Sequence, residues 1–369
     1  MTKKYSFIFP VYKEGNIVEN ILKILEDPYP SEFKEIIISV DCPTEEFLNK
    51  LRNFMHLENV KIIISSERRG KVAAVNDATT YATGDIFIFL DSDVKIENIN
   101  LNELLKDFEE ADIVEFYKRI EGKKILGKMY EIEFNVYYEI IQPYFSKKRK
   151  NIFLNGGGFG IKKSVWKALE GYTKTIIEDA DLATRAYNMN YSYKLTKNIS
   201  LEVESIESFK KWFDQKKRWL SGGLEWFLIH VRTIINFMFK DPAFMGILLL
   251  LNPSIVYFLF TLIAPYFLIY SISKSIYMSL VNKISFFYLF ALSVETIHKF
   301  IYYFIYIMSM FAFISFLLFL AFLYKKKLGN PLYIMLFVIF YSSVQSILLI
   351  YITLYYLLFE GYPKFNWKV

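Results

Sequence analysis

Residues 86–93 of the chain, Ile86-Phe-Ile-Phe-Leu90 followed by Asp91-Ser-Asp93, decide the fold class that the sequence predicts. An unbroken run of five apolar residues is typical of a strand buried on both faces of a parallel sheet. Two carboxylates follow at the point where this strand must end. Because ligands bind at the carboxyl ends of strands in open α/β sheets, the stretch predicts an α/β fold and the edge where its site lies.

Other segments extend this pattern in both directions. Four more apolar runs are expected to be strands: Tyr5–Phe9, Glu35–Val40, Val60–Ile64 and Asp112–Phe116. Three segments between these runs are expected to be helices: Ile17–Leu25, Glu45–Phe54 and Val72–Tyr81. Such alternation predicts a Rossmann-like, mostly parallel sheet with helices on both faces. Further helices are expected over 122–150 and Lys163–Leu169, on either side of a Gly-rich segment at 155–160.

The composition changes near residue 240. Of 369 residues, 54% are hydrophobic and 22% charged, and Phe, Leu, Ile and Tyr dominate 242–360. A span across ~30 Å of hydrocarbon needs about 20 apolar residues, which the stretches beginning at Ala243, Ile284 and Pro331 provide. We expect an α-helical transmembrane domain over 242–369 with three helices. A fourth, inside 276–300, is the alternative.

Topology follows from the basic residues. Lys325-Lys326-Lys327 should lie on the cytoplasmic side, because basic loops resist translocation. No signal-peptide core follows Met1, so the α/β domain over 1–225 is expected on the same side. Residues 226–241 have apolar positions at helical spacing and are expected to form an amphipathic helix in the interface plane. The chain is thus predicted to be an integral protein of the plasma membrane.

Several classes of site are excluded by composition. One cysteine and three histidines rule out a disulfide framework and a His- or Cys-rich metal site. The net charge of +6 is modest, and nucleic-acid binding is not expected, because no basic face with aromatic platforms is visible. We attribute the basic cluster near the membrane to attraction by anionic lipids; its members are Lys210, Lys211, Lys216, Lys217 and Arg218.

Three strand ends offer residues for a metal and a diphosphate. Asp91 and Asp93, at i and i+2, can share one hard cation such as Mg²⁺ or Mn²⁺. Asp41 ends the second strand, and the basic turn Arg68-Arg-Gly-Lys71 after the third suits phosphate. A solvated acidic turn, a helix cap and a solvated loop are the structural alternatives. Because all three strand ends are expected at one edge of the sheet, the residues that follow them favour a site for a metal–nucleoside diphosphate.

Two helical motifs complete the set. Glu178-Asp179-Ala-Asp181 opens a helix, where carboxylates stabilise the dipole or one of them serves as a general base. Gln215-Lys-Lys-Arg218-Trp219 places three side chains on one face. Arg suits phosphate and Trp stacks on a sugar ring, although a basic helix with an interfacial Trp would have the same pattern.

Taken together, these motifs resemble the family 2 glycosyltransferases of the GT-A fold. The set, in order, is Pro10-Val-Tyr-Lys-Glu14, Asp41, Gly70-Lys71 with Asn76, Asp91-Ser-Asp93, Glu178-Asp179 and Gln215-x-x-Arg218-Trp219. More narrowly, it is similar to the membrane branch with cellulose, hyaluronan and chitin synthases and ceramide glucosyltransferases. The resemblance covers roughly residues 5–225.

The resemblance implies an inverting, metal-dependent transferase that uses a nucleoside diphosphate sugar, a UDP-sugar being favoured over a GDP-sugar. Asp179 would be the catalytic base, Asp91 and Asp93 would hold Mg²⁺ or Mn²⁺, and Glu178 and Trp219 would contact the acceptor. The implied donor-binding residues are Pro10, Asp41, Arg68, Lys71, Asp91, Gln215 and Arg218. Relatives commonly have Asp-Asp-Gly-Ser where this chain has Val40-Asp-Cys-Pro43, so nucleoside contacts are expected to differ.

Three hypotheses remain for the overall function. The first is transfer of one sugar to a lipid or lipid-linked acceptor, which we favour because three helices enclose no wet channel for a polymer. The second is processive polysaccharide synthesis with secretion, for which a homo-oligomer could supply more helices. The third is a non-catalytic membrane protein that binds nucleotide. Intramembrane Glu295, His298 and Lys299, spaced to pair with one another, give the third little support.

Overall fold

The computed structural model describes residues 2–244, 297, 303 and 330–364. The chain divides into two compact units, one formed by 1–241 with 351–369 and the other by 242–350. The expected spans beginning at Ala243 and Ile284, and the Lys325–Lys327 loop, lie almost entirely outside the described residues.

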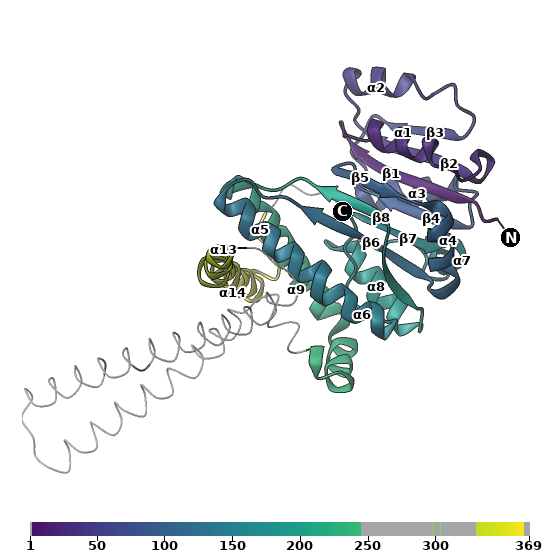
Figure 1. The fold of residues 1–369 in the computed structure, drawn as a ribbon. Helices are drawn as coiled ribbons and strands as arrows, with labels where there is room; N and C mark the ends of the chain where they lie inside the picture. The colour runs from purple at the N-terminus through teal and green to yellow at the C-terminus, as the bar shows by residue number, and fades with distance from the viewer. Residues whose placement is uncertain (1, 245–296, 298–302, 304–329, 365–369) are drawn as a thin grey trace, which may run out of the picture. The chain divides into compact units, whose positions relative to one another are not determined.

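One eight-stranded sheet organises the first unit, in the order β3-β2-β1-β4-β7-β6-β8-β5 (Figure 1). Its strands are β1 (Tyr5–Tyr12), β2 (Lys34–Asp41), β3 (Val60–Ser65), β4 (Ile86–Leu90), β5 (Val94–Ile99), β6 (Ile113–Ile120), β7 (Gly158–Lys162) and β8 (Tyr193–Val203). Its helices are α1 (Val18–Glu26), α2 (Glu45–Arg52), α3 (Lys71–Thr80), α4 (Leu101–Glu110), α5 (Ile125–Val136), α6 (Gln142–Lys148), α7 (Lys163–Ala168), α8 (Glu178–Asn188) and α9 (Phe209–Lys240). A 3-10 turn, η1 (Ser31–Phe33), precedes β2, and a π-helical turn, η2 (Tyr137–Ile141), joins α5 to α6.

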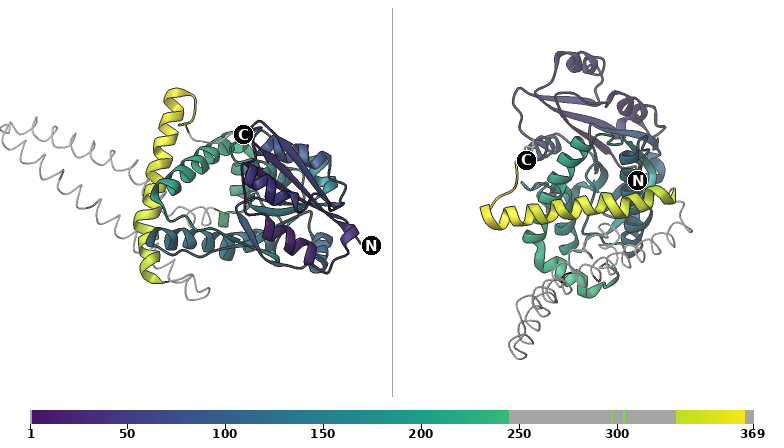
Figure 2. Two further views of the ribbon diagram at one scale, coloured as in Figure 1. Left: turned by 90° about the horizontal axis from the view of Figure 1, so that it is seen from above. Right: turned by 90° about the vertical axis from the view of Figure 1, so that its left-hand side faces the viewer.

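The first four strands confirm the predicted parallel arrangement. β1 pairs in parallel with β2 and β4, and β2 with β3. Every residue of β2 and β4 is buried, as the unbroken apolar runs predicted. The carboxyl ends of β1, β2 and β4 therefore meet at one edge of the sheet. Figure 1 shows α1 and α2 with β1 to β3 toward one end of the domain and α5 toward the other, and Figure 2 gives two further views.

The other half of the sheet is mixed, so the expectation of a mostly parallel sheet is wrong there. β7 runs antiparallel to both β4 and β6, and β5 runs antiparallel to β8. β7 begins in the Gly-rich segment, where the sequence predicted no strand. A Cβ on Gly158 would lie 2.2 Å from Leu201 Cδ1, and one on Gly160 would lie 2.6 Å from Phe108 Cζ. Neighbouring side chains thus fill the space that apolar residues of this strand would otherwise occupy.

The strand β5 fixes the loop that carries the two carboxylates. The Asn20 amide on α1 donates to the Val94 carbonyl and accepts from the Ile96 N–H, both at 2.8 Å. Because Asp91 and Asp93 lie between β4 and β5, both ends of their loop are held by buried structure. No strand was predicted here, although the alternation of buried and exposed residues at its start is typical of a half-buried strand.

Helix α9 runs through residue 225, where a domain boundary is expected, and is kinked five residues later. Its one non-helical residue is His230 (φ −109°, ψ 18°). Beyond it Ile234 and Phe237 are buried, while Ile235 and Phe239 are exposed.

Among the described residues outside the sheet domain, α13 (Pro331–Leu336) and the π-helical η3 (Phe337–Tyr341) precede α14 (Ser342–Phe359). α14 has 18 residues and a mean hydropathy of 1.6, so by length and composition it could cross a membrane.

Candidate active site

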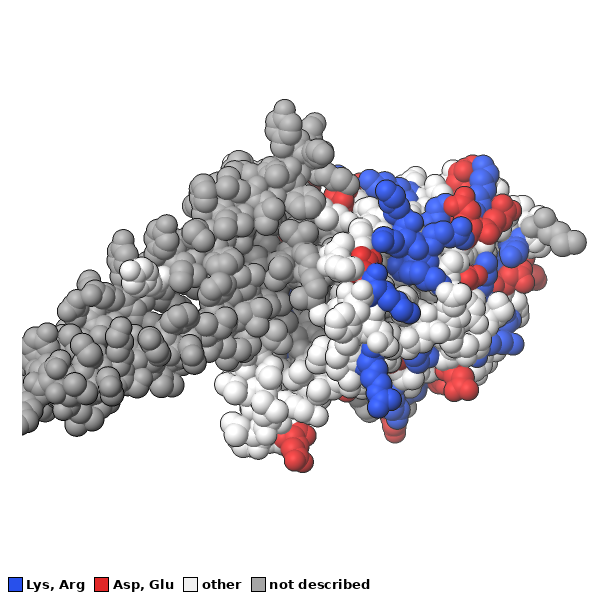
Figure 3. Space-filling view, turned by 90° about the horizontal axis from the view of Figure 1, so that it is seen from below, with Lys and Arg blue, Asp and Glu red and all other residues white. Residues whose placement is uncertain are grey.

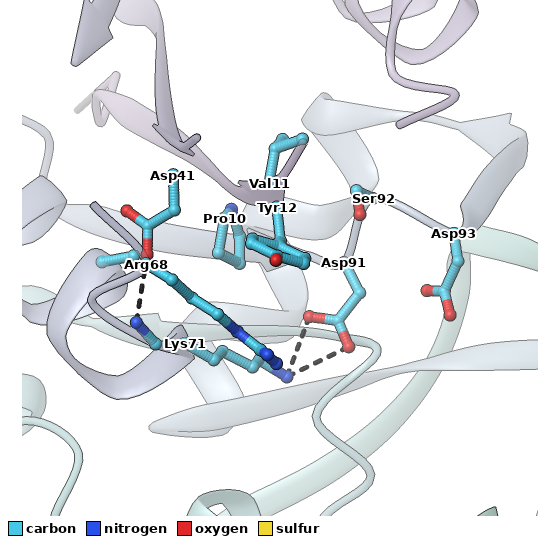
Figure 4. A pocket seen from close by; sticks show the side chains of 11 residues that line it. Pro10, Val11, Tyr12, Asp41, Arg68, Lys71, Asp91, Ser92 and Asp93 are labelled. Atoms are coloured by element: carbon cyan, nitrogen blue, oxygen red, sulfur yellow. Dashed lines mark hydrogen bonds and ion pairs between the residues drawn. The ribbon is translucent and has the colours of Figure 1, made fainter. Parts of the chain in front are cut away.

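A pocket opens where β1, β2 and β4 end, and six of the predicted site residues line it (Figure 4). They are Pro10, Asp41, Arg68, Lys71, Asp91 and Asp93. The edge predicted from the apolar run before Asp91 is therefore the edge where the structure is hollowed. Val11, Tyr12, Gly70, Ala74 and Ser92 complete the lining.

The Asp41 carboxylate anchors the basic turn. It accepts hydrogen bonds from the Arg69 N–H (2.6 Å), from Arg69 Nε (2.8 Å) and from the Gly70 N–H (3.0 Å). Arg69 also donates to Asp77 (2.7 Å) and to Ser39 (2.9 Å). Gly70 has φ 96°, a left-handed conformation that favours glycine. The sequence placed Arg69 in this basic turn, but only Arg68 was expected among the donor-binding residues.

Arg68 instead lies at the pocket beside Tyr12. Its guanidinium carbon is 4.4 Å from the centroid of the Tyr12 ring, and the Tyr12 side chain is 43% exposed. The planar guanidinium and the aromatic ring therefore form one stacked, accessible wall.

Lys71 connects the pocket with the acidic motif on α8. Its ammonium lies 2.9 Å from Asp91 Oδ1 and 3.0 Å from Glu178 Oε1. Burial favours the neutral amine, but the carboxylates of Asp91 and Glu178 outweigh it and raise the pKa of Lys71 well above its usual value. Lys71 is therefore charged at neutral pH and holds the two acids together.

The three carboxylates of the acidic motif differ in their surroundings. Asp179 accepts from the Gly156 N–H at 2.5 Å and is partly exposed. Desolvation by surrounding protein, and then the charge of Glu178, raise its pKa to about 6. Asp179 can therefore hold or release a proton near neutral pH, as a general base must.

Asp181 is occupied by structural partners. It accepts from Thr173 (2.5 Å) and Arg185 Nε (2.7 Å), and it lies 2.7 Å from His230 Nε2. Although burial favours the neutral acid, hydrogen bonds from His230, Thr173 and Arg185 lower its pKa to about 2. A carboxylate so acidic and so fully paired is a poor proton acceptor.

The predicted set Gln215, Arg218 and Trp219 lies on α9 and does not line the pocket of Figure 4. The charge of Arg218 nevertheless acts on Asp93, where it favours the ionised form. Trp219 lies beneath a cation, since Lys216 Nζ is 4.3 Å from its ring centroid. The helix therefore adjoins the site from the Asp93 side.

The structure corrects the expectation that Lys216 is an exposed basic residue near lipid. Lys216 was assigned to a basic surface cluster facing lipid, but its side chain is 2% exposed and its ammonium lies 2.5 Å from Glu133 on α5. This ion pair joins α9 to α5. Lys210 and Lys211 are exposed, as expected.

Asp91 and Asp93 fit the requirements of a divalent cation. Both belong to one loop and face one pocket, with the Asp91 carboxylate turned toward Lys71 in Figure 4. Crowding by protein atoms and the charge of Asp91 raise the pKa of Asp93, a repulsion that a bound cation would relieve. No three His, Cys, Asp or Glu side chains cluster for a metal in the described part of the chain. Phosphate oxygens and water would therefore complete the coordination, as Mg²⁺ commonly requires.

Two buried groups beside the site were not singled out from the sequence. The Tyr172 hydroxyl is buried without a hydrogen-bond partner among the described residues. Both its backbone N–H and its carbonyl pair with the Asn76 amide, at 3.0 and 2.9 Å, which explains the asparagine of that motif. Lys118 on β6 is also buried, with its ammonium against the Gly-rich segment.

Comparison with known proteins relates this site to others. Residues 6–169 match the sequence model described as Glycosyl transferase family 2. The chain is 24% identical over 231 residues to the probable glycosyltransferase YdaM of Bacillus subtilis, covering 60% of this chain and 55% of that protein. It is 27% identical over 227 residues to the poly-beta-1,6-N-acetyl-D-glucosamine synthase of Staphylococcus epidermidis, covering 60% of this chain and 54% of that protein. The chain therefore matches about half the length of both relatives.

Among solved structures, the mannosyltransferase PcManGT from Pyrobaculum calidifontis, in complex with GDP-Man and Mn²⁺, is similar in fold. The TM-score is 0.51 at 19% sequence identity, over 63% of this chain and 65% of that one.

Proposed function

We propose that the protein is a glycosyltransferase with a GT-A-type catalytic domain, and that it transfers a sugar from a nucleoside diphosphate sugar to a lipid or lipid-linked acceptor at the membrane. One observation supports this most. Lys71 bridges Asp91 in the pocket and Glu178, whose neighbour Asp179 has a pKa near 6. A cation for a diphosphate and a base for an acceptor hydroxyl thus lie side by side.

The donor would occupy the pocket. The stacked pair Tyr12 and Arg68 offers a flat surface for a nucleobase and a guanidinium for phosphate. Lys71 would contact the diphosphate, and Asp41 would fix the turn that carries Arg68 and Lys71. Arg218 and Gln215 on α9 would approach from the Asp93 side. We favour a UDP-sugar over a GDP-sugar because of the family resemblance.

Asp91 and Asp93 would hold Mg²⁺ or Mn²⁺, which would neutralise charge on the leaving diphosphate. Asp179 would take the proton of the acceptor hydroxyl as its oxygen bonds to the anomeric carbon. The bond from that carbon to the donor phosphate breaks in the same displacement, so the configuration inverts and the nucleoside diphosphate leaves. Glu178 and Trp219 would line the acceptor side.

Membrane association is supported by α14 and by the apolar sequence after Pro242. Lys148 on α6 lies 3.6 Å from Asp241, directly before that apolar sequence. Lys and Arg side chains gather over one region of the face drawn in Figure 3, as suits a surface near anionic lipid. We place the catalytic domain on the cytoplasmic side of the plasma membrane, where nucleotide sugars would reach it.

A processive polysaccharide synthase is the second candidate, favoured by the similarity to a poly-beta-1,6-N-acetyl-D-glucosamine synthase. The two are separated by incubating the detergent-solubilised full-length protein with radiolabelled nucleotide sugars and membrane lipids. Label in the organic phase supports the lipid acceptor. Ethanol-insoluble label supports polymer synthesis, and no transfer with any donor would contradict both.

The pH profile should report Asp179. Its pKa of about 6 in the unliganded protein predicts that kcat/KM falls as pH drops through about 6, because the protonated carboxyl cannot accept a proton. The rate should be measured between about pH 5 and 8, with thermal unfolding at each pH to show that the fold persists. An unchanged rate down to about pH 5 would exclude this base.

Topology can be tested by cysteine labelling. We expect Lys326→Cys, in a chain whose own Cys42 is replaced by Ala, to resist a membrane-impermeant maleimide added to intact cells. Lys147→Cys, an exposed position of the catalytic domain, is the matched control. Both should react only after permeabilisation. External labelling of Lys326→Cys alone would place that loop outside.

A further inference from the structure

Lys118 is a buried cation beneath the active site that the mechanism above leaves unused. Its side chain is 1% exposed. Its ammonium donates to the Tyr138 hydroxyl (2.8 Å) and to the carbonyls of Asn155 (3.0 Å) and Gly158 (3.2 Å). An ammonium has three donors, so all are used. Two of them hold the ends of one turn, Asn155–Gly158.

That turn contacts both functional acids. The Gly156 N–H donates to Asp179 Oδ2 at 2.5 Å, and the Gly157 carbonyl accepts from the Asp91 N–H at 3.3 Å. Gly156, which lies between the two carbonyls bound by Lys118, therefore orients the proposed base Asp179. The next residue, Gly157, positions the loop of Asp91 at the proposed metal site.

The fit around the turn is close. A Cβ on Gly156 would lie 2.8 Å from Asp179 Oδ2 and 3.0 Å from Asp179 Cβ. A Cβ on Gly157 would lie 3.3 Å from Lys118 Cε, the flexible part of a side chain. Asp179 thus packs directly against Gly156, so a displacement of the turn would be passed to its carboxylate.

Burying this cation is costly, and its surroundings offset the cost only in part. The Glu115 carboxylate, fully buried, lies 3.9 Å away and accepts from Tyr138 (3.0 Å) and Tyr193 (2.9 Å). Burial lowers the pKa of Lys118 to about 8, against the opposing charges of Glu115, Asp91 and Asp179. The like charge of Lys71 adds to the lowering. Apolar side chains of similar volume often match a buried ion pair in stability, so stability alone does not explain Lys118.

We propose that Lys118 is a positioning residue for sugar transfer. It holds the turn Asn155–Gly158 in the shape in which Gly156 aims the Asp179 carboxylate and Gly157 meets the loop of Asp91. The inference rests on the proposed role of Asp179 as the base. It adds a residue that touches neither substrate and acts through the turn.

The test uses the full-length protein in detergent. Lys118→Met keeps the length of the side chain and removes the three hydrogen bonds. Lys118→Met combined with Glu115→Gln also removes the partner charge, so that the variant folds without an unpaired buried acid. We expect kcat to fall about 10²-fold in both, the size of effect that a misplaced reacting group produces. Donor affinity and the midpoint of thermal unfolding of the double variant should change little.

The matched controls separate positioning from general damage. Glu115→Gln alone keeps the bonds of Lys118 to the turn, so its kcat should stay within about threefold of the wild type. Gly156→Ala should reproduce the loss, because its new methyl group meets Asp179. Gly157→Ala should be milder, because its methyl group meets the flexible Lys118 side chain.

A double-mutant cycle identifies the route of the effect. In an Asp179→Asn background, Lys118→Met should lower the residual rate no further, since residues that act as a unit are not additive. An additive loss, or full activity of the Lys118→Met and Glu115→Gln pair, would overturn the proposal. Full activity of Asp179→Asn alone would instead refute the proposed base, so the two failures are distinguishable.

Discussion

Asp179→Asn is expected to remove nearly all sugar transfer and to leave the protein folded and able to bind its donor. Asparagine keeps the shape of the side chain and can still accept from the Gly156 N–H. It cannot take a proton, and a general base contributes about 10²–10⁴-fold in rate. At neutral pH the wild-type group carries an unfavourable buried charge, as its raised pKa indicates. Thermal stability should therefore stay level or rise slightly.

Asp181→Asn is the matched control, and we expect the opposite pattern. The pKa of Asp181 falls from 3.8 to about 2 in the folded protein. A shift of this size corresponds to roughly 2 kcal/mol of stability. Because the folded pKa is lowered, this contribution is complete above about pH 4 and is lost as pH falls through 2. The variant should melt earlier at neutral pH and keep most of its rate per folded molecule. Transfer by Asp179→Asn above about a tenth of wild type would make Glu178 the next candidate.

Asp93→Ala should abolish turnover and metal-dependent donor binding. Its carboxylate and that of Asp91 are the two on the loop between β4 and β5 that line this pocket, and Asp91 alone would bind a divalent ion weakly. The fold should persist, because Asp93 has a raised pKa and its removal relieves repulsion with Asp91.

Donor binding should be measured calorimetrically with and without Mn²⁺, beside Glu103→Ala, which removes an exposed acid on α4. Wild-type activity that persists in EDTA would contradict the metal site. Loss of donor binding without metal as well would show that Asp93 acts on the donor directly.

The fold was predictable where burial leaves a signal in the chain itself. β1 to β4 contain the apolar runs named from the sequence, and their parallel pairing was expected from the helices between them. β7 was missed because Gly158 and Gly160 take their packing from Leu201 and Phe108, which are distant in sequence. No local pattern records such a strand. β8 was missed because polar residues such as Lys194, Lys197 and Asn198 interrupt its apolar positions.

The candidate site was likewise predictable only in part. Asp41, Lys71, Asp91 and Asp93 were placed at one edge from strand ends alone, and the structure brings them into one pocket. Only the family resemblance selected Asp179 over Asp181. Local patterns could not, because the first cause of the low pKa of Asp181 is a hydrogen bond from His230, which is 49 residues further along the chain. Lys118 lies beyond the strand expected over Asp112–Phe116, and only the folded turn at 155–158 shows its partners.

The strand order has a consequence for how the protein is made. β5 pairs only with β8 in the described sheet, so residues 94–99 wait for a partner until Val203 has left the ribosome. Until then β5 and β6 expose unpaired edges, which are prone to aggregate. The apolar sequence beyond Pro242 emerges later still. Nascent chains shorter than about 203 residues should therefore remain protease-sensitive. During translation, the pairing of β5 with β8 would precede delivery of the apolar sequence beyond Pro242 to the membrane.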